Sequence, residues 1–273
     1  MPRAFRLDAR RLQAGRKTRL AEHKPRSTPG FRGDKAAAKP LIDGLSRKLE
    51  TLQELLYADG RHRLLVVLQG PDASGKDGVV RHVFEGVNPS GVRVASFKAP
   101  TEEELARDFL WRVHGRVPRN GEIVLFNRSH YEDVLVVRVR KLAPKPVWER
   151  RFDQINDFER LLVESGTTIL KFFLHISREE QGERFRERIA DPKKRWKFRR
   201  GDLEDRALWP QYQRAYQDVL RRTSTSWAPW YVIPADREWY RNLAIGSIVV
   251  ETLEKLDLAY PPGEPGLQSI EID

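Results

Sequence analysis

Short apolar or alternating runs recur along this chain, and longer stretches between them carry apolar residues at every third or fourth position. The short runs have the length of β-strands, and the longer stretches are typical of amphipathic helices. The five predicted strands cover residues 64–69, 91–97, 123–126, 168–176 and 230–234. Because strands and helices alternate, we predict an α/β fold in which one parallel sheet has helices on both faces.

Several predicted helices carry clear packing or starting signals. One stretch places five leucines on a single helical face: Leu41, Leu45, Leu49, Leu52 and Leu56. A helix packed on the sheet is the simplest interpretation of this stripe, and a role in oligomerisation stays open. Thr101 with Glu104, and Ser177 with Glu180, have the spacing of capping boxes. We therefore expect helices to begin at Thr101 and Ser177.

Three sections of the chain differ in composition. Residues 1–32 are rich in Arg, Lys, Pro and Gly with little periodicity, so we expect an extended N-terminal arm rather than a separate domain. This arm is either a solvated tail or an extra contact for a polyanion. We expect residues 33–258 to form one domain, and residues 259–273, which contain a Pro-Pro-Gly run, to form a loose C-terminal tail.

The first predicted strand runs directly into a loop of the form G-x-x-x-x-G-K, from Gly70 to Lys76, and a predicted helix follows. The order of strand, glycine loop and helix is the context of a phosphate-binding P-loop. The glycines let backbone N–H groups converge on an anion, and Lys76 brings a full charge to the outer phosphates. A chance match in an ordinary loop is the alternative. The residues predicted to contact phosphate here are Gly70, Ala73, Ser74, Gly75, Lys76 and Asp77.

Two acids stand at unusual positions in this loop. Asp77 follows Lys76, where P-loop enzymes usually have a Ser or Thr that binds Mg²⁺. Asp72 lies inside the loop, and a carboxylate beside a polyanion is costly unless a divalent cation lies between them. We therefore predict that Asp72 binds Mg²⁺, directly or through water. Asp77 is either a metal ligand or a first-turn acid that the helix dipole favours.

The third predicted strand delivers further polar groups to the same edge of the sheet. P-loop enzymes usually have an acid at its end for a second Mg²⁺ contact, but this chain has Asn127. An amide can orient a metal-bound water but adds no charge, so Asp72, Glu132 or Asp133 has to complete the metal environment. Arg128 is suited to hold a phosphate through two parallel hydrogen bonds, and a structural pair with a nearby acid is its alternative role.

The chain carries 50 Lys and Arg against 39 Asp and Glu, a formal net charge of +11. This excess indicates a polyanionic partner, and DNA, RNA, an anionic membrane or inorganic polyphosphate would all fit it. Nine cations gather within residues 184–200, after the fourth predicted strand, where small-molecule kinases place a closing lid. We predict a lid over about residues 182–205, with a solvated charged face as the alternative. Lys98 follows the second predicted strand, at the edge where α/β sheets bind ligands.

The sequence contains no cysteine, which excludes disulfides and cysteine-bound metal sites. Its basic N-terminus lacks the apolar run of a signal peptide, and no segment approaches the ~18 apolar residues of a membrane helix. We therefore expect a soluble, cytoplasmic protein.

Four motifs, in this order, resemble the polyphosphate kinase 2 family, and the resemblance covers about residues 33–256. They are GPDASGKDG (70–78), FNRSHYEDV (126–134), KRWK (194–197), and RTST (222–225) with APW (228–230). The second motif is most similar to that of the class III members, which phosphorylate both AMP and ADP.

The resemblance implies a three-layer P-loop kinase fold similar to thymidylate kinase, with a five-stranded parallel sheet and a helical lid. It also implies Mg²⁺ as cofactor, a homo-oligomer such as a dimer or tetramer, and no nucleic acid or membrane as partner. The implied reaction is phosphoryl transfer between inorganic polyphosphate and AMP or ADP, giving ADP or ATP.

Carried over to this chain, the resemblance assigns the catalytic residues Asp72, Lys76, Asn127, Arg128 and Glu132. Many family members have an aspartate at the place of Asn127, so Glu132 becomes the first acid to test beside Asp72. The metal ligands are then Asp72, Asn127 and Glu132. The phosphate- or nucleotide-binding cations outside the loop are Lys98, Arg128, Arg184, Arg188, Lys194, Arg195 and Lys197.

Two other functions are compatible with parts of the pattern. An ATP-dependent nucleoside monophosphate kinase would use the same loop and lid, but the cations exceed what one triphosphate needs. A basic nucleic-acid-binding P-loop protein would use the cation-rich segment to track a phosphate backbone, but the sequence contains no recognised nucleic-acid motif.

Overall fold

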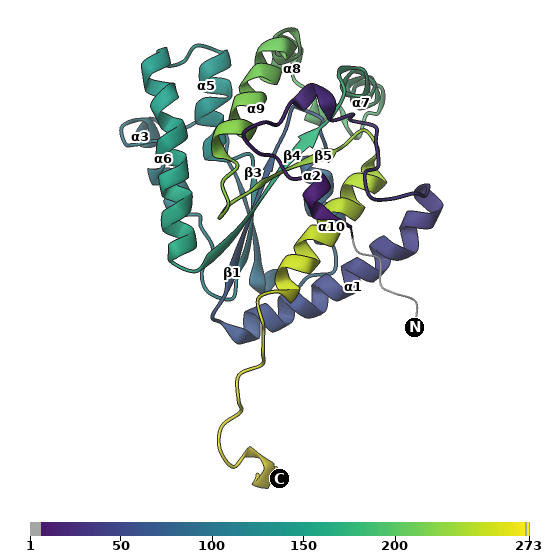
Figure 1. The fold of residues 1–273 in the computed structure, drawn as a ribbon, viewed down its shortest axis with the longest axis vertical. Helices are drawn as coiled ribbons and strands as arrows, with labels where there is room; N and C mark the ends of the chain where they lie inside the picture. Colours follow the sequence, from purple (N-terminus) through teal and green to yellow (C-terminus); the bar gives the residue numbers. More distant parts are fainter. Residues whose placement is uncertain (1–6, 271, 273) are drawn as a thin grey trace.

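The computed structural model describes residues 7–270 and 272 and contains one five-stranded sheet (Figure 1). The order across the sheet is β2-β3-β1-β4-β5, and each pair of neighbouring strands is parallel. The strands are β1 (Arg63–Gln69), β2 (Val92–Ser96), β3 (Ile123–Asn127), β4 (Thr167–His175) and β5 (Trp230–Pro234). The predicted parallel α/β sheet is therefore confirmed, with strand ends within about two residues of those expected.

Helices cover both faces of the sheet, which gives three layers. The α-helices are α1 (Lys35–Asp59), α2 (Lys76–Val83), α3 (Glu102–Leu105), α4 (Trp111–His114), α5 (Val136–Val139), α6 (Lys145–Glu164), α7 (Arg178–Ala190), α8 (Arg200–Ala207), α9 (Trp209–Thr223) and α10 (Glu238–Glu254). Short 3-10 helices are η1 (Ala9–Arg11), η2 (Leu20–Glu22), η3 (Pro89–Gly91), η4 (His130–Val134), η5 (Arg195–Lys197) and η6 (Leu267–Ser269).

Alternate residues of β1 face the two helical layers, as the pleat of a strand requires. Leu65 and Val67 pack with α6 and α9, whereas Leu64 and Val66 pack with α1, α2 and α10. Because both faces of β1 are buried, the strand is apolar from Leu64 to Leu68, and its end is held between β3 and β4. This strand carries the glycine loop.

The leucine stripe forms the buried side of α1, which lies along α10. Leu49 and Leu56 are fully buried in the core shared with β1 and α10. The helix begins after Asp34, whose carboxylate accepts a hydrogen bond from the N–H of Ala37, and it ends at Gly60 in a left-handed conformation. Packing in the core, the simpler of the two interpretations, therefore explains these two leucines.

The two predicted capping boxes differ in the structure. Thr101 and Glu104 form both reciprocal hydrogen bonds at the start of α3. At the start of α7, the hydroxyl of Ser177 accepts from the N–H of Glu180 at 3.1 Å. The carboxylate of Glu180 instead accepts from Nε of Arg184 at 2.9 Å, so the expected second bond of this box is replaced by an ion pair one turn further on.

The described part of the N-terminal arm, residues 7–32, packs against the domain, so the interpretation of these residues as a solvated tail is wrong. The N–H of Ala14 donates to the carbonyl of Trp230, and the N–H of Val232 donates to the carbonyl of Leu12, both at 2.7 Å. The arm thus forms an antiparallel bridge along β5, which protects the edge of the sheet. Residues 1–6 of the predicted arm lie outside the described residues.

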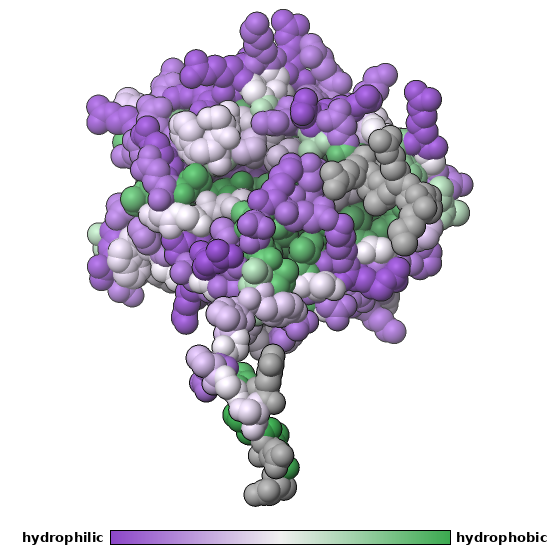
Figure 2. All heavy atoms as spheres, turned by 60° about the horizontal axis from the view of Figure 1, so that its bottom comes forward, coloured by the Kyte–Doolittle hydropathy of each residue, from purple (hydrophilic) through white to green (hydrophobic). Residues whose placement is uncertain are grey.

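Residues 259–270 run away from the body of the fold (Figure 1). Figure 2 shows the same segment projecting from a face that is mostly hydrophilic, with hydrophobic residues gathered near its centre. Within the described residues, we find no helix that combines the length and the apolar character needed to cross a membrane.

Candidate active site

The glycine loop leaves the end of β1 and leads into α2. Gly70 and Gly75 have φ angles of 155° and 97°, and Ala73 is also left-handed at 62°. A Cβ on Gly70 would lie 2.8 Å from the carbonyl oxygen of Leu174, and one on Gly75 would collide with the guanidinium of Arg241. Glycine is therefore required at both ends of the loop, which explains the sequence spacing in structural terms.

Lys76 is the first residue of α2, and its side chain is folded back under the loop. Its Nζ donates to the carbonyl of Gly70 at 2.7 Å and to that of Pro71 at 3.1 Å. Burial lowers the pKa of this ammonium to about 8, and the nearby charge of Arg128 acts in the same direction. The carboxylates of Asp72, Glu132 and Asp77 oppose that effect, so these side chains surround Lys76.

Helix α7 holds the middle of the loop. The amide of Gln181 donates to the carbonyl of Asp72 at 3.0 Å, and Nη1 of Arg184 donates to the carbonyl of Ala73 at 2.9 Å. Arg184 also donates to the carbonyl of Ala235, at 2.8 Å. Arg184 is one of the predicted lid cations, but in this structure its guanidinium holds the backbone of the loop in place.

These contacts occupy the loop carbonyls and leave several N–H groups free. Within the part of the chain that the structure describes, the N–H groups of Asp72, Ala73, Gly75 and Lys76 donate no hydrogen bond. Ser74 is fully buried, and its N–H closes the turn onto Pro71. Unpaired amides at the start of a helix, next to a buried cation, form a binding site for an anion.

Arg128 reaches the loop from the end of β3. Its backbone is left-handed, with φ of 62°, and its N–H donates to the carbonyl of Leu68. This conformation aims the guanidinium at the loop, where Nη2 lies 2.7 Å from Oδ1 of Asp72. Burial disfavours the guanidinium charge, but Glu132 and Asp72 outweigh it and raise the pKa of Arg128. The expected pair with an acid is therefore present at the loop itself.

The other predicted polar residues of this edge are held by neighbours. Nδ2 of Asn127 donates to Oδ1 of Asp77 at 2.6 Å. Glu132 accepts a hydrogen bond at 3.1 Å from the amide of Gln69, the last residue of β1. Asp133 points elsewhere and pairs with Arg151 at 2.8 Å. The structure thus separates Glu132, which faces the loop, from its acidic neighbour Asp133.

The predicted metal ligands Asp72, Asn127 and Glu132 are not assembled into one ligand shell. Asp72 is engaged by Arg128 and Asn127 by Asp77, and the described residues contain no group of three or more His, Cys, Asp or Glu that could hold a metal by themselves. Carboxylate oxygens nevertheless suit Mg²⁺, which is often held by one or two carboxylates together with substrate phosphates and water. The donor set around Lys76 therefore fits such a metal.

The predicted lid consists of α7, η5 and α8. Four of its cations make only local contacts: Arg188 with the carbonyl of Lys197, Lys194 with Asp191, Arg195 with the carbonyl of Ile189, and Lys197 with the ring of Trp196. In α8, burial raises the pKa of Asp202, and the nearby charge of Asp72 in the loop adds to this rise. Lys98 is exposed after β2, as expected for the sheet edge.

Sequence reasoning missed Arg241 and Gln181. Arg241 is fully buried, and its guanidinium lies against the Cα atoms of Gly75 and Gly78. Its acidic partner, Glu238, is 3.4 Å away and mostly exposed. A lone arginine in the apolar last helix was the available signal. Gln181, by contrast, carries no pattern that would distinguish it from a surface glutamine.

A family model described as "Polyphosphate kinase 2" matches residues 33–260. This chain belongs to the polyphosphate kinase 2 family. The match includes the glycine loop, the β3–η4 segment and the lid, so the residues described above lie within the part of the chain that the family shares.

Two similar proteins and one solved structure match more than nine-tenths of the chain. The AMP/ADP-polyphosphate phosphotransferase of Meiothermus ruber is 59% identical over 96% of this chain and 98% of its own length. The ADP-polyphosphate phosphotransferase of Rhodopseudomonas palustris is 42% identical over 93% and 92%, respectively. The crystal structure of polyphosphate kinase 2 from Arthrobacter aurescens superimposes with a TM-score of 0.94 at 43% identity, over 97% of this chain and 95% of that one.

Proposed function

We propose that this protein transfers a phosphoryl group between inorganic polyphosphate and AMP or ADP, forming ADP or ATP in a reversible, Mg²⁺-dependent reaction. The observation that carries the proposal is the glycine loop, whose free N–H groups and buried Lys76 form an anion site in a chain of this family. The name of the relative from Meiothermus ruber supports both AMP and ADP as acceptors.

The chain's own residues account for binding and charge stabilisation. The loop amides and Lys76 hold the end of the polyphosphate, and Arg128 exchanges its contact with Asp72 for the transferring phosphoryl group. The nucleotide phosphate attacks in line, and it needs no general base because it is already ionised. Because donor and product are both phosphoanhydrides, mass action sets the direction.

Mg²⁺ would screen the charge that the two phosphate chains share. Asp72 and Glu132 are the acids that would hold it, with Asn127 orienting a bound water. Asp77 already orients Asn127, at 2.6 Å, so it would act through that amide rather than as a separate ligand. The proposed ligands are therefore those predicted from the sequence, and Asp77 is added as the residue that orients Asn127.

The lid cations Arg188, Lys194, Arg195 and Lys197 would turn toward the polyphosphate when the lid closes. The proposal takes residues 33–258 as the catalytic domain, 182–205 as its lid and 259–273 as a tail. It also takes the active form to be a homo-oligomer, either a dimer or a tetramer.

The test is an assay of purified protein with Mg²⁺, polyphosphate and either AMP or ADP, in which the nucleotide products are separated. We expect ADP and ATP from AMP, and ATP from ADP, with polyphosphate as the only donor. Transfer from ATP alone would instead make this an ATP-dependent nucleoside monophosphate kinase. Tight, salt-sensitive DNA binding without any transfer would make it a nucleic-acid-binding protein.

A further inference from the structure

A fully buried ion pair lies beneath the segment that carries Arg128 and Glu132. It joins Lys171, in the middle of β4, to Glu159 on α6, and neither side chain is exposed to solvent. Nζ of Lys171 also donates to the hydroxyl of Tyr131 at 2.9 Å and to the carbonyl of Thr223 at 2.7 Å. All three donor positions of the ammonium are thus occupied.

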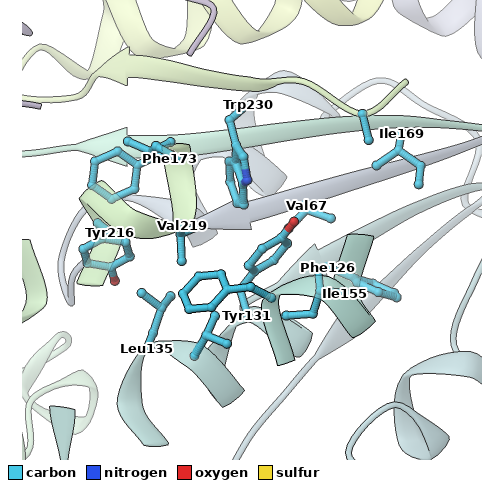
Figure 3. Close-up of a cluster of buried hydrophobic side chains, with 14 of the residues drawn as sticks. Val67, Phe126, Tyr131, Leu135, Ile155, Ile169, Phe173, Tyr216, Val219 and Trp230 are labelled. Atoms are coloured by element: carbon cyan, nitrogen blue, oxygen red, sulfur yellow. The ribbon is translucent and has the colours of Figure 1, made fainter. Parts of the chain in front are cut away.

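The carboxylate of Glu159 binds η4 at two successive residues. Its Oε1 accepts from the hydroxyl of Tyr131 at 2.8 Å and lies 3.3 Å from Nε2 of His130. Both rings are fully buried, and Figure 3 shows Tyr131 beneath Trp230 in the core, with ring centroids 4.8 Å apart. Both the hydrogen bonds to Glu159 and the packing of the buried rings therefore hold η4 in place.

The residues on either side of His130 and Tyr131 face the glycine loop. Arg128 precedes it and contacts Asp72, whereas Glu132 follows it and contacts Gln69. The side chain of Gln69 also donates to the hydroxyl of Ser129, at 3.2 Å. A rotation of η4 about its anchor would displace both ends of the segment together, and the network prevents that rotation.

A gain in folding stability does not by itself explain the buried pair of Lys171 and Glu159. Removing two ions from water is costly, and a buried pair is often no more stabilising than apolar side chains of similar volume. What the pair adds is a fixed position for η4, because the hydroxyl of Tyr131 is bound both to Glu159 of α6 and to Lys171 of β4. Lys171 is bound in turn to the carbonyl of Thr223 at the end of α9.

We propose that Glu159 and Lys171 are positioning residues, which hold η4 so that Arg128 and Glu132 face the phosphate site. This inference rests on the proposed function, since it assumes that Arg128 and Glu132 act on the reaction. It also gives a role to buried residues in two of the four motifs. Lys171 joins the hydroxyl of Tyr131 to the carbonyl of Thr223, and Nε1 of Trp230 donates to the hydroxyl of Thr223 at 2.9 Å.

The principal test is the paired substitution Glu159→Gln with Lys171→Met, which removes both charges and keeps the volumes similar. Each single variant leaves one buried ion or dipole without its partner, so both should melt earlier than the double variant. We expect the double variant to keep a melting temperature close to wild type, while kcat falls about 10- to 100-fold because the acting groups are misplaced. KM for polyphosphate should change little, since the loop and Lys76 are untouched.

A milder variant keeps the test decisive if the double variant does not fold. Tyr131→Phe removes one hydroxyl and leaves the ion pair, and we expect it to lower kcat about 3- to 10-fold while lowering the melting temperature less than either single charge variant does. Glu164→Gln, which changes an exposed carboxylate on the same helix, is the matched control and should be neutral. Wild-type kcat in the folded double variant, or in Tyr131→Phe, would overturn the inference.

Arg128→Ala, assayed beside these variants, distinguishes failure of the positioning role from failure of the proposed active site. If Arg128→Ala is inactive and the network variants are fully active, the positioning role is wrong but the proposed site stands. If Arg128→Ala is itself fully active, the proposed site is wrong. The inference predicts that Arg128→Ala loses most activity and that the network variants lose part of it.

Discussion

At the scale of single residues, Lys76 gives the site a pH dependence that can be measured. Its pKa of about 8 means that the free protein loses this positive charge as the pH rises through that value. We expect kcat/KM for polyphosphate, which reports the free enzyme, to be constant below about pH 7 and to fall above about pH 8. The kcat profile should fall only at higher pH, because bound phosphate favours the charged lysine. A kcat/KM that stays flat through about pH 9.5 would contradict the role of this charge.

The glycine loop could be predicted from sequence spacing, but the contacts of its side chains could not. The spacing from Gly70 to Lys76 specified both the backbone turn and the position of the cation. It could not show that Asp72 pairs with Arg128, because that contact depends on how β3 and β1 align across the sheet. Arg241, which is buried against the loop, stands at no fixed sequence spacing from it.

The metal site can be tested through its three predicted ligands. If Asp72 supplies charge to Mg²⁺, Asp72→Asn should raise the Mg²⁺ concentration needed for half-maximal rate, and Glu132→Gln should raise it less. Asn127→Asp adds a carboxylate next to Asp77, and we expect activity to persist with a lower Mg²⁺ requirement. Mg²⁺ titrations of the three variants provide the measurement. An unchanged requirement in Asp72→Asn would remove Asp72 from the ligand set.

At the scale of elements, the sequence predicted the strands and the main helices because their apolar periods are strong. The arm was harder, since Leu7, Leu12 and Leu20 are buried at spacings that match neither a helix nor a strand. The bridge between the arm and β5, together with hydrogen bonds that join Thr18 and Leu20 to α9, places those residues against the core. The predicted lid rests on the charge of its segment, and charge does not specify that Arg184 binds the loop while Arg188 binds the carbonyl of Lys197.

The conformation of the glycine loop depends on Gly75, where the loop joins α2. Gly75→Ala would place a methyl group in the space of the Arg241 guanidinium and force a left-handed alanine, so we expect a loss of about 1–3 kcal/mol in unfolding free energy and weaker polyphosphate binding. Gly44→Ala, in the open middle of α1, is the matched control and should be neutral or stabilising. Thermal unfolding of the two variants tests this, and equal melting temperatures would show that the loop tolerates the methyl group.

The arm provides a second test at this scale. Leu12 is almost fully buried where the arm crosses β5, so Leu12→Ala should cost about 2–4 kcal/mol of unfolding free energy. Leu105→Ala changes an exposed leucine and should change stability by less than about 0.5 kcal/mol. Denaturant titrations measure both values. If Leu12→Ala is as stable as the control, the arm does not contribute to the folded domain in solution.

At the scale of the whole molecule, the strand order explains why distant segments form one site. Placing β1 between β3 and β4 brings the loop next to Arg128 on one side and to the start of α7 on the other. Alternation of strands and helices predicted a parallel sheet, but the order β2-β3-β1-β4-β5 is set by pairing between strands far apart in the chain. The family resemblance implied a five-stranded parallel sheet but no strand order, so this order comes from the structure.

The central claim is direct transfer from polyphosphate to a nucleotide at the glycine loop. Its most direct test uses polyphosphate labelled with ³²P, unlabelled AMP or ADP, and Mg²⁺, with wild-type protein and Lys76→Ala compared in the same assay. We expect label to appear in ADP and ATP with the wild type, and about 10²-fold more slowly with Lys76→Ala, which loses a charge aimed at the transferring group. Absence of label in both nucleotides, while γ-labelled ATP does label AMP, would contradict the account.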